Sequence, residues 1–469
     1  MRKIVALAVV IMAIVAVILA MSAGPARTNS EVTMEVTTIE QSALARKLMN
    51  MSQAQLRKLE EGKKKGLLEL RPALLPTKEN IVGKNIHFGW PLATKAGDAL
   101  VVIYLRRCAH YHHPPWDQDS SGVMMIRSVD GGRTWSKPTD LRQYARKADG
   151  SLPFYSKGEC ITTTIDGAIV LGHETGTFRS EDQGVTWEHY SHDPPFSRRL
   201  SAKETTTFNC PRLIEHPTYG LVRMCGIKGI AEDQSSSGYP IYRNKVHVAN
   251  SLDGGRTWKE QKYEVPLVGP AEPAMLLHEG ALIMIGRPYH KTTSSRKTWT
   301  TPYTQHWSKT GWFPLQGKLT NMSATDRGKS GVPGKGLDTP DLSFNPVTKR
   351  LEVVTTDRMG GGVEGRRWQV PLSLNLWSID PEDLLAGSAE WRFEGCLFER
   401  QTSMPNQALQ RAEEKMSDGC HPAAAVIDEE EGVQHIFVYM GNPAGPAGIF
   451  HLKRTLDTDK LSAFLMESK

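Results

Sequence analysis

Three octets of the chain share the pattern Ser-x-Asp-x-Gly-x-Thr-Trp, at residues 128–135, 180–187 and 251–258. A unit that recurs at intervals of tens of residues is typical of propellers, solenoids and other arrays. Within each octet the Asp side chain can cap its own backbone, the Gly can adopt a positive φ, and the Trp can pack back onto a sheet. The octets therefore predict β-hairpin turns on repeated sheet units.

The octets resemble the Asp-box (BNR) repeat of the sialidase-like, or neuraminidase-like, β-propellers. That resemblance implies a fold, because these boxes lie on blade hairpins and say little about catalysis. From residue 86 onward, short apolar runs come in pairs that meet at a turn, as at Asp166-Gly167, which is a strong hairpin signal. Six such units follow one another, in agreement with the six blades of the family. The sequence thus predicts an all-β, six-bladed β-propeller over residues 86–469, with a strand before residue 86 as one way to close the ring.

The N-terminus has the layout of an export signal. Arg2 and Lys3 precede an apolar run over residues 4–21, and small residues follow at 22–24. This arrangement is typical of a signal peptide, and eighteen apolar residues are also just enough to span a bilayer as an uncleaved anchor. We therefore expect residues 1–24 to be a signal peptide or signal anchor. The protein would be exported, either secreted, periplasmic or membrane-anchored through residues 4–21.

Residues 25–85 do not follow the strand pattern. Leu44, Leu48, Met51 and Leu56 recur near helical spacing, which favours a short helical spacer. A partly disordered linker is the alternative. The net charge of +6 is small for 469 residues and gives no nucleic-acid signal. No C-x-x-C pair occurs, so a zinc ribbon is excluded, and the sequence predicts neither a bound metal nor a cofactor.

A sialidase-type site, by the same resemblance, holds the substrate carboxylate with three arginines and uses a Tyr nucleophile, an activating Glu and an Asp acid/base. Arginine suits the first task because its planar fork meets a carboxylate in bidentate fashion. The segment 272–287 resembles the family's Glu-Pro, strand, Gly turn, strand, Arg pattern. Glu272 would then be the activating Glu and Arg287 a carboxylate-binding Arg, at the same end of two antiparallel strands. Strand-end surface residues are the alternative interpretation.

The two other arginines match less closely. Arg367 falls in the region of the second family arginine, with Arg358 as a rival. The position of the first family arginine holds Gly89. Arg106 and Arg107 lie one strand further along and could replace it, so Arg107 is a further substrate-binding candidate. Solvated basic residues are the alternative interpretation for each.

The acid/base and nucleophile positions depart from the family pattern. Gly122 occupies the usual acid/base position, with Asp117 and Asp119 close by on the preceding loop. Cys420 and His421 occupy the place where the Tyr nucleophile would be. The catalytic candidates are therefore Asp117, Asp119 and His421 beside Glu272, and a covalent tyrosyl mechanism is in doubt.

A histidine cluster at 110–113, together with Tyr155 and Arg287, suggests a second chemistry, because His/Tyr pairs serve some propeller polysaccharide lyases. Three hypotheses follow. The first is a sialidase-like glycoside hydrolase acting on an acidic, sialic-acid-like oligosaccharide or polysaccharide, which Glu272 and Arg287 favour. The second is a non-catalytic glycan-binding propeller, favoured by the missing Arg, Asp and Tyr. The third is a lyase.

Overall fold

A computed structural model describes most of the chain from residue 39 onward. The described residues are 39–109, 121–146, 150, 159–173, 176–191, 205–209, 211–234, 240–261, 270–288, 297–302, 313–315, 337–357, 373–386, 391–400, 418–419, 425–442 and 445–467. The chain divides into two units, residues 1–33 and 34–469, and only the second contains described residues. The predicted export segment therefore lies outside them. No helix in the described part is long and apolar enough to cross a membrane.

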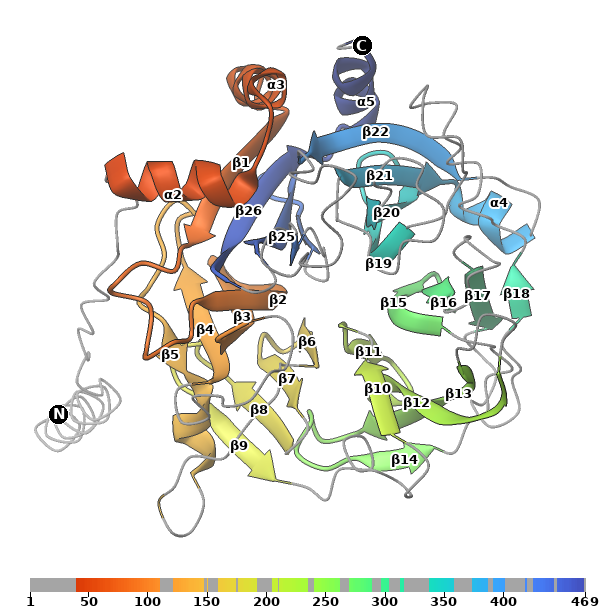
Figure 1. Ribbon diagram of the computed structural model, residues 1–469. Coiled ribbons are helices and arrows are strands. Elements are labelled where there is room, and N and C mark those ends of the chain that lie inside the picture. The colour runs from red at the N-terminus through yellow and green to blue at the C-terminus, as the bar shows by residue number, and fades with distance from the viewer. Residues whose placement is uncertain are drawn as a thin grey trace, which may run out of the picture. The chain divides into compact units, whose positions relative to one another are not determined.

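The described residues of the second unit form five hydrogen-bonded sheets, and few helices accompany them (Figure 1). Three sheets have four antiparallel strands each. They are β6 (Cys160–Thr163), β7 (Ile169–His173), β8 (Gly176–Ser180), β9 (Glu188–Ser191); β15 (Pro270–His278), β16 (Ala281–Pro288), β17 (Lys297–Pro302), β18 (Phe313–Leu315); and β19 (Leu337–Asn345), β20 (Arg350–Asp357), β21 (Ser373–Ile379), β22 (Arg392–Glu399). A fourth sheet has five strands: β10 (Thr205–Asn209), β11 (Ile214–His216), β12 (Gly220–Gln234), β13 (Pro240–Ser251) and β14 (Lys259–Gln261).

The fifth sheet joins the two ends of the described chain. It contains β1 (Leu68–Leu74), β2 (His87–Ala96), β3 (Ala99–Arg107), β4 (Gly122–Ser128), β5 (Thr139–Asp140), β23 (Asp418–Gly419), β24 (Ala425–Asp428), β25 (Val433–Gly441) and β26 (Ala447–Thr455). β1 pairs antiparallel with β26, so an N-terminal strand completes a group of C-terminal strands. Among the described residues, the strand pairing between that group and the group β2–β5 consists of the parallel pair His87 and Ala447, although β2 also packs against β24, β25 and β26.

The sheets form a closed ring. The contacts join one set of strands, called the first strands below, which are β2, β6, β10 with β11, β15, β19 and β24. β2 contacts β6, Ile161 of β6 bridges to Arg212 ahead of β11, and both β10 and β11 contact β15. β15 contacts β19, β19 contacts β24, and β24 contacts β2 again. Figure 1 shows these first strands around a common centre, with the later strands of each sheet further out. These first strands therefore lie closest to the ring centre.

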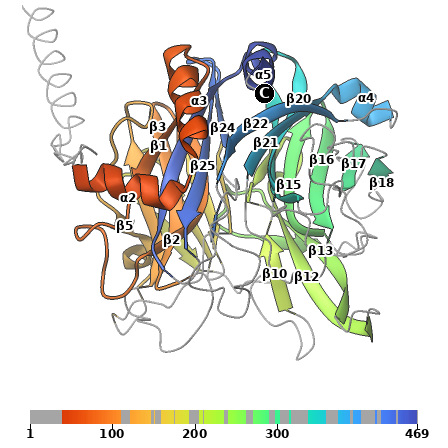
Figure 2. The same ribbon diagram turned by 45° about the horizontal axis from the view of Figure 1, so that its top comes forward.

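The described helical segments are α2 (Ile39–Met49), α3 (Gln53–Lys64), α4 (Pro381–Ala386), α5 (Thr458–Glu467) and the short 3-10 turn η1 (Leu141–Ala145). α2 and α3 contact β26 and β1, where the ring closes, and α5 contacts β22, whereas α4 connects β21 to β22 and η1 contacts β4 and β9. Ser52 caps α3 by accepting a hydrogen bond from the amide of Gln55 at 3.1 Å, which satisfies a donor at the helix start. Gly62 lets α3 approach β1 and α5 closely, because a Cβ there would lie 3.1 Å from Leu68 and 3.2 Å from Phe464. Figures 1 and 2 show α3 and α5 on the same side of the sheets.

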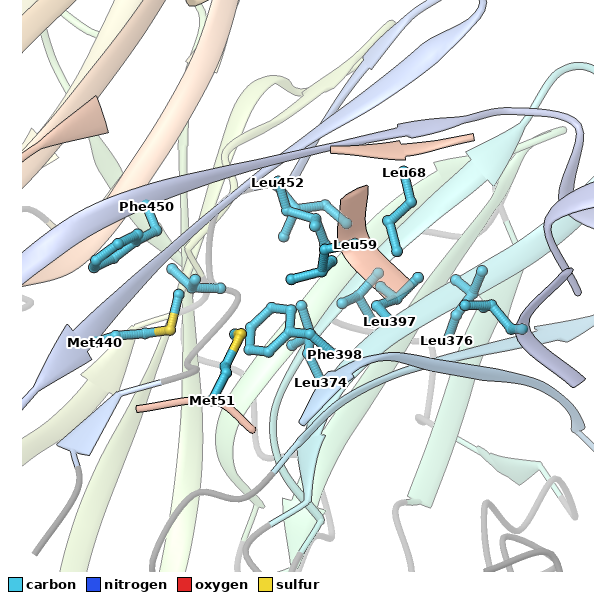
Figure 3. Close-up of a cluster of buried hydrophobic side chains, with 14 of the residues drawn as sticks. Met51, Leu59, Leu68, Leu374, Leu376, Leu397, Phe398, Met440, Phe450 and Leu452 are labelled. Atoms are coloured by element: carbon cyan, nitrogen blue, oxygen red, sulfur yellow. The ribbon is translucent and has the colours of Figure 1, made fainter. Parts of the chain in front are cut away.

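The helices share a core with the strands (Figure 3). Met51 and Leu59 from the helical region pack with Phe398 of β22 and Leu452 of β26, and all four are buried. Burying such side chains contributes about 1.5–3 kcal/mol each. The stretch predicted as a spacer over 25–85 therefore contains helices that pack against the ring, and β1 within it belongs to a sheet.

Each octet forms the turn between the last two strands of its sheet. The turns join β4 to β5, β8 to β9 and β13 to β14. In the octet at 180–187, the amide of Thr186 donates to Asp182 Oδ1 at 2.8 Å and its hydroxyl donates to Oδ2 at 2.6 Å. Ser180 Oγ donates to Asp182 Oδ1 and accepts from the amide of Gly184, both at 2.8 Å. The octets at 128–135 and 251–258 repeat these four bonds, and the equivalent glycines have φ of +77°, +89° and +91°.

Candidate functional site

The candidate site residues fall into three groups. Only Arg107 has a described side chain, whereas Glu272 and Arg287 lie in strands whose backbone the structure describes at these positions. The other candidates lie outside the described residues; these candidates are Asp117, Asp119, Arg358, Arg367 and His421. The histidine cluster at 110–113 and Tyr155 also lie outside them.

Strands β15 and β16 bring the backbones of Glu272 and Arg287 to one end of their sheet. Ala271 lies opposite Arg287, and the register shifts between Ala271 and Ala274. Glu272 and Pro273 of β15 therefore face a single residue of β16, Gly286, which is a β-bulge. A bulge bends its strand and re-aims the side chain that it carries. Glu272, the neighbour of Ala271, lies inside this bulge.

The bulge recurs in two other first strands, each time around a residue followed by proline. In β2 the register shifts between Gly89 and Leu92, around Trp90-Pro91. In β19 it shifts between Asp338 and Asp341, around Thr339-Pro340. Proline fits a bulge because it has no amide hydrogen for the strand ladder.

The remaining sheets have a related sequence feature at the same place. In the sequence, Cys210-Pro211 precedes β11 and His421-Pro422 precedes β24. Glu159 comes directly before β6, which begins at Cys160. The residue before the Pro, or before Cys160, is thus a repeated position at the start of the first strands. The repeated positions hold Trp90, Glu159, Cys210, Glu272, Thr339 and His421. This X-Pro repeat is present in the sequence. It is easily overlooked there, because each proline taken alone indicates only the end of a strand.

Arg107, the last residue of β3, lies beside aromatic side chains near the start of β2. Arg107 pairs in register with His87, and its guanidinium lies 5.4 Å from the ring centre of Trp90. The Trp90 ring is 5.5 Å from Tyr439 and 5.9 Å from His87, measured between ring centres. Burial lowers the pKa of Arg107 to about 10, so the side chain stays charged at neutral pH.

The place of the missing family arginine is filled by this aromatic group. Gly89 lies opposite Leu105, and a Cβ on Gly89 would lie 3.3 Å from His87 Nε2 and 3.6 Å from Tyr439. A Cβ at position 89 would therefore press on the His87 ring and touch the Tyr439 ring. The structure explains why a glycine fits here.

No family model and no curated protein matches this chain. Solved structures do. A protein of unknown function from Dyadobacter fermentans is 14% identical, with 82% of this chain and 99% of that chain covered and a TM-score of 0.51. A Trypanosoma rangeli sialidase in complex with 2,3-difluorosialic acid is 13% identical, with 84% of this chain covered and a TM-score of 0.53. The match spans 60% of that sialidase chain.

The chain has a sialidase-like β-propeller fold. At this level of identity the likeness concerns the fold alone, so the chemistry of the propeller must be argued from its own residues.

Another arginine of the propeller, Arg212, forms a bidentate ion pair with the carboxylate of Asp341. Arg212 donates to both oxygens of Asp341, from Nε at 2.9 Å and from Nη2 at 3.0 Å. Asp341 is 1% exposed and also accepts the amide of Ala425 at 2.5 Å. Because these residues come from three sheets, the bidentate pair ties the inner strands of the propeller together.

Glu159, which occupies the same repeated position as Glu272, has a partner as well. Its carboxylate pairs with the guanidinium of Arg223, and Arg223 is fully buried. Arg223 also donates to the carbonyl of His173 at 3.4 Å. A carboxylate neutralised in this way is held in its charged form and is poorly suited to proton transfer.

The described residues contain one grouping of the metal-ligand type. Atoms of Asp428, Glu431 and His435 lie within 4.8 Å of one another. Lys95 Nζ is 2.9 Å from Asp428, and Lys453 pairs with Glu431. Ammonium groups therefore already compensate both carboxylates.

Proposed function

We propose that the protein is a six-bladed, exported propeller that binds an acidic, sialic-acid-like glycan and cleaves it as an exo-sialidase-type glycoside hydrolase. The nine-stranded sheet counts as two blades in this proposal, since the strands of its two halves pair at a single position, His87 with Ala447. The octets would be Asp boxes, because the three share one set of hydrogen bonds. The glycan would be the partner, with no nucleic acid and no cofactor involved.

One observation carries the catalytic proposal, the pairing of β15 with β16. It brings the backbone of Arg287 opposite Ala271, next to Glu272 in the bulge. In the proposal Arg287 grips the substrate carboxylate and Glu272 handles the proton at the reacting centre. Arg107 would contribute a second positive charge. Asp117, Asp119, His421, Arg358 and Arg367 remain candidates for the other roles.

The test is release of sialic acid from 3′-sialyllactose by the wild-type protein and two variants. Glu272→Gln should spare binding and reduce turnover, because it changes proton transfer more than shape. Arg287→Ala should weaken binding by roughly 1.5–3 kcal/mol through loss of a charge-assisted bidentate contact. Glu279→Gln, in the exposed turn at the other end of the same strands, is the matched control and should leave both quantities unchanged. Equal effects of Glu272→Gln and Glu279→Gln would contradict the assignment.

A second function, glycan binding without turnover, is favoured by the rings that fill the space around Gly89. In that case the wild-type protein would bind 3′-sialyllactose and release no sialic acid. The lyase alternative rests on histidines outside the described residues. An unsaturated sugar product, detected by its ultraviolet absorbance, would favour it.

We also propose export through residues 1–24, with membrane attachment through residues 4–21 if the signal is not cleaved. The support is the sequence layout of two basic residues before an apolar run. N-terminal sequencing of the protein from fractionated cells tests it. A full-length chain recovered only from the cytosol would contradict it.

A further inference from the structure

Trp90 has an unusual backbone conformation. Its φ is +51°, a region that bulky side chains rarely occupy because it strains the backbone. It lies in the β2 bulge, at the same repeated position as Glu272 in β15. Such strain persists where the surroundings enforce it, and it is common at binding sites. The strained conformation re-aims the indole ring relative to the rest of β2.

The indole ring rests on a fixed layer of side chains. Tyr439 and His87 behind it are both fully buried, and their ring centres are 5.7 Å apart. His87 Nδ1 is 3.1 Å from the carbonyl oxygen of Gly445, which orients the imidazole. Trp90 itself is only partly buried. It therefore presents part of a rigid aromatic surface at the bulge of β2.

A positive charge lies over this surface. The guanidinium of Arg107 is 5.4 Å from the Trp90 ring centre, and the side chain is 8% exposed. A cation held over an aromatic face is stabilised there. A pyranose ring offers an apolar C–H face that packs on an aromatic surface, and a carboxylate on that ring is attracted to a guanidinium.

We propose that Trp90 and Arg107 form a sugar-stacking subsite for a carboxylated pyranose. Trp90 supplies the stacking surface for the sugar ring, and Arg107 supplies the preference for the anionic sugar. This subsite rests on the proposed function, because it assigns a ring-binding role at the same acidic-glycan site. It adds a binding residue, Trp90, at a repeated position that elsewhere in the propeller holds Glu272.

The test compares two probes, the methyl glycoside of N-acetylneuraminic acid and the methyl ester of that glycoside, by isothermal titration. Trp90→Gly removes the ring while tolerating the positive φ, and should weaken binding of both probes at least tenfold. Trp90→Phe should stay within about threefold of wild type, because it keeps an aromatic face. Arg107→Gln should weaken binding of the acid and leave the ester unchanged. Trp258→Phe, a partly buried Trp in an outer octet, is the matched control and should change neither.

The outcomes separate the subsite from the proposed function. Wild-type affinity for both probes in a folded Trp90→Gly protein overturns the subsite and leaves the function standing. Equal losses for acid and ester in Arg107→Gln overturn the role of its charge. If the wild-type protein and the Trp258→Phe control bind neither probe, the proposed function fails and the subsite fails with it.

Discussion

The outer hairpins and the ring closure are stabilised in opposite ways. In each octet the bonds are local, since Asp182 accepts from Thr186 four residues away. At the closure, Arg454 pairs with Glu352 at a separation of 102 residues, and both are fully buried. The comparison indicates that each octet shapes its own hairpin through local bonds, whereas the buried polar contacts at the closure join residues far apart in the sequence, beside the hydrophobic core already described.

The closure contacts form one network between β19, β20, β25, β26 and α5. Glu352 accepts from Asn345 at 2.9 Å and from the hydroxyl of Thr458 at 2.5 Å. Arg454 donates to Gln434 at 2.7 Å. Every charged or polar partner in this network is buried, so each member depends on the others for compensation.

The largest expected effect comes from breaking this network. Arg454→Met should lower the free energy of unfolding by about 3–5 kcal/mol, because it leaves the Glu352 carboxylate buried without its cation. Urea denaturation measures the change. Arg256→Met is the control, since Arg256 pairs with Glu181 at the surface and such pairs contribute about 0–1 kcal/mol. Equal losses in the two variants would contradict the contrast between closure and hairpins.

The tie across the inner strands should come next. Asp341→Asn removes the bidentate acceptor of Arg212, and hydrogen bonds to charged groups contribute about 1.5–3 kcal/mol. Arg212 is 26% exposed, so water compensates part of its charge and the loss should be smaller than for Arg454→Met. Thermal unfolding is the measurement, with Asp98→Asn in the exposed β2–β3 turn as control. An unchanged midpoint would exclude a stabilising role for the tie.

Mild acid should weaken the closure before the hairpins. His435 and His451 are buried and lie 2.8 Å apart between ring nitrogens. Burial lowers the pKa of His435 from 6.5 to about 4 and lowers the pKa of His451 as well. The unfolded chain thus takes up protons as pH falls through about 6.5 while the folded chain does not. Their contribution is complete above that pH and is lost as pH falls toward 4.

We expect His435 alone to account for a loss of about 1.5 kcal/mol between pH 6.5 and 5, from roughly 1.4 kcal/mol per unit of pKa difference, and His451 adds to the loss in the same direction. Replacing both histidines with Gln should flatten the stability curve over this range. Burial raises the pKa of Asp182, but hydrogen bonds from Thr186 and Ser180 outweigh it and the pKa is lowered from 3.8. The octets should therefore weaken only below about pH 4. An unaltered slope in the double variant would contradict the assignment to the histidines.

The smallest effect is expected at a single octet. Asp182→Ala removes an acceptor for Thr186 and Ser180, and losing a cap of this kind costs about 1 kcal/mol. The same change at Asp130 or Asp253 should cost a similar amount, because the bonds are the same. Differential scanning calorimetry of the three variants checks this. A loss at one octet as large as that of Arg454→Met would overturn the comparison.

These two regions also differ in what the sequence could predict. The octets were recognisable because their bonding partners lie within eight residues of one another. Glu352 and Arg454 carry no such signal, because their pairing depends on the closed ring. The sequence could not predict that β1 pairs with β26 for the same reason, because apolar periodicity does not identify a distant partner strand.

The candidate site shows the same limit. Antiparallel strands around a Gly turn were enough to expect Glu272 and Arg287 at one sheet end, and the register of β15 and β16 agrees for their backbones. Trp90 could not be found this way, because its relevance depends on a bulge and on contacts with Tyr439. The X-Pro repeat is the sequence signal that would have pointed to it.

The most direct measurement is a crystal structure of the protein soaked with 3′-sialyllactose. We expect the acidic sugar to lie at the bulges of β2 and β15, with its ring on Trp90 and its carboxylate near Arg107 or Arg287. A sugar bound only at the outer octet hairpins, with the two bulges empty, would contradict the account.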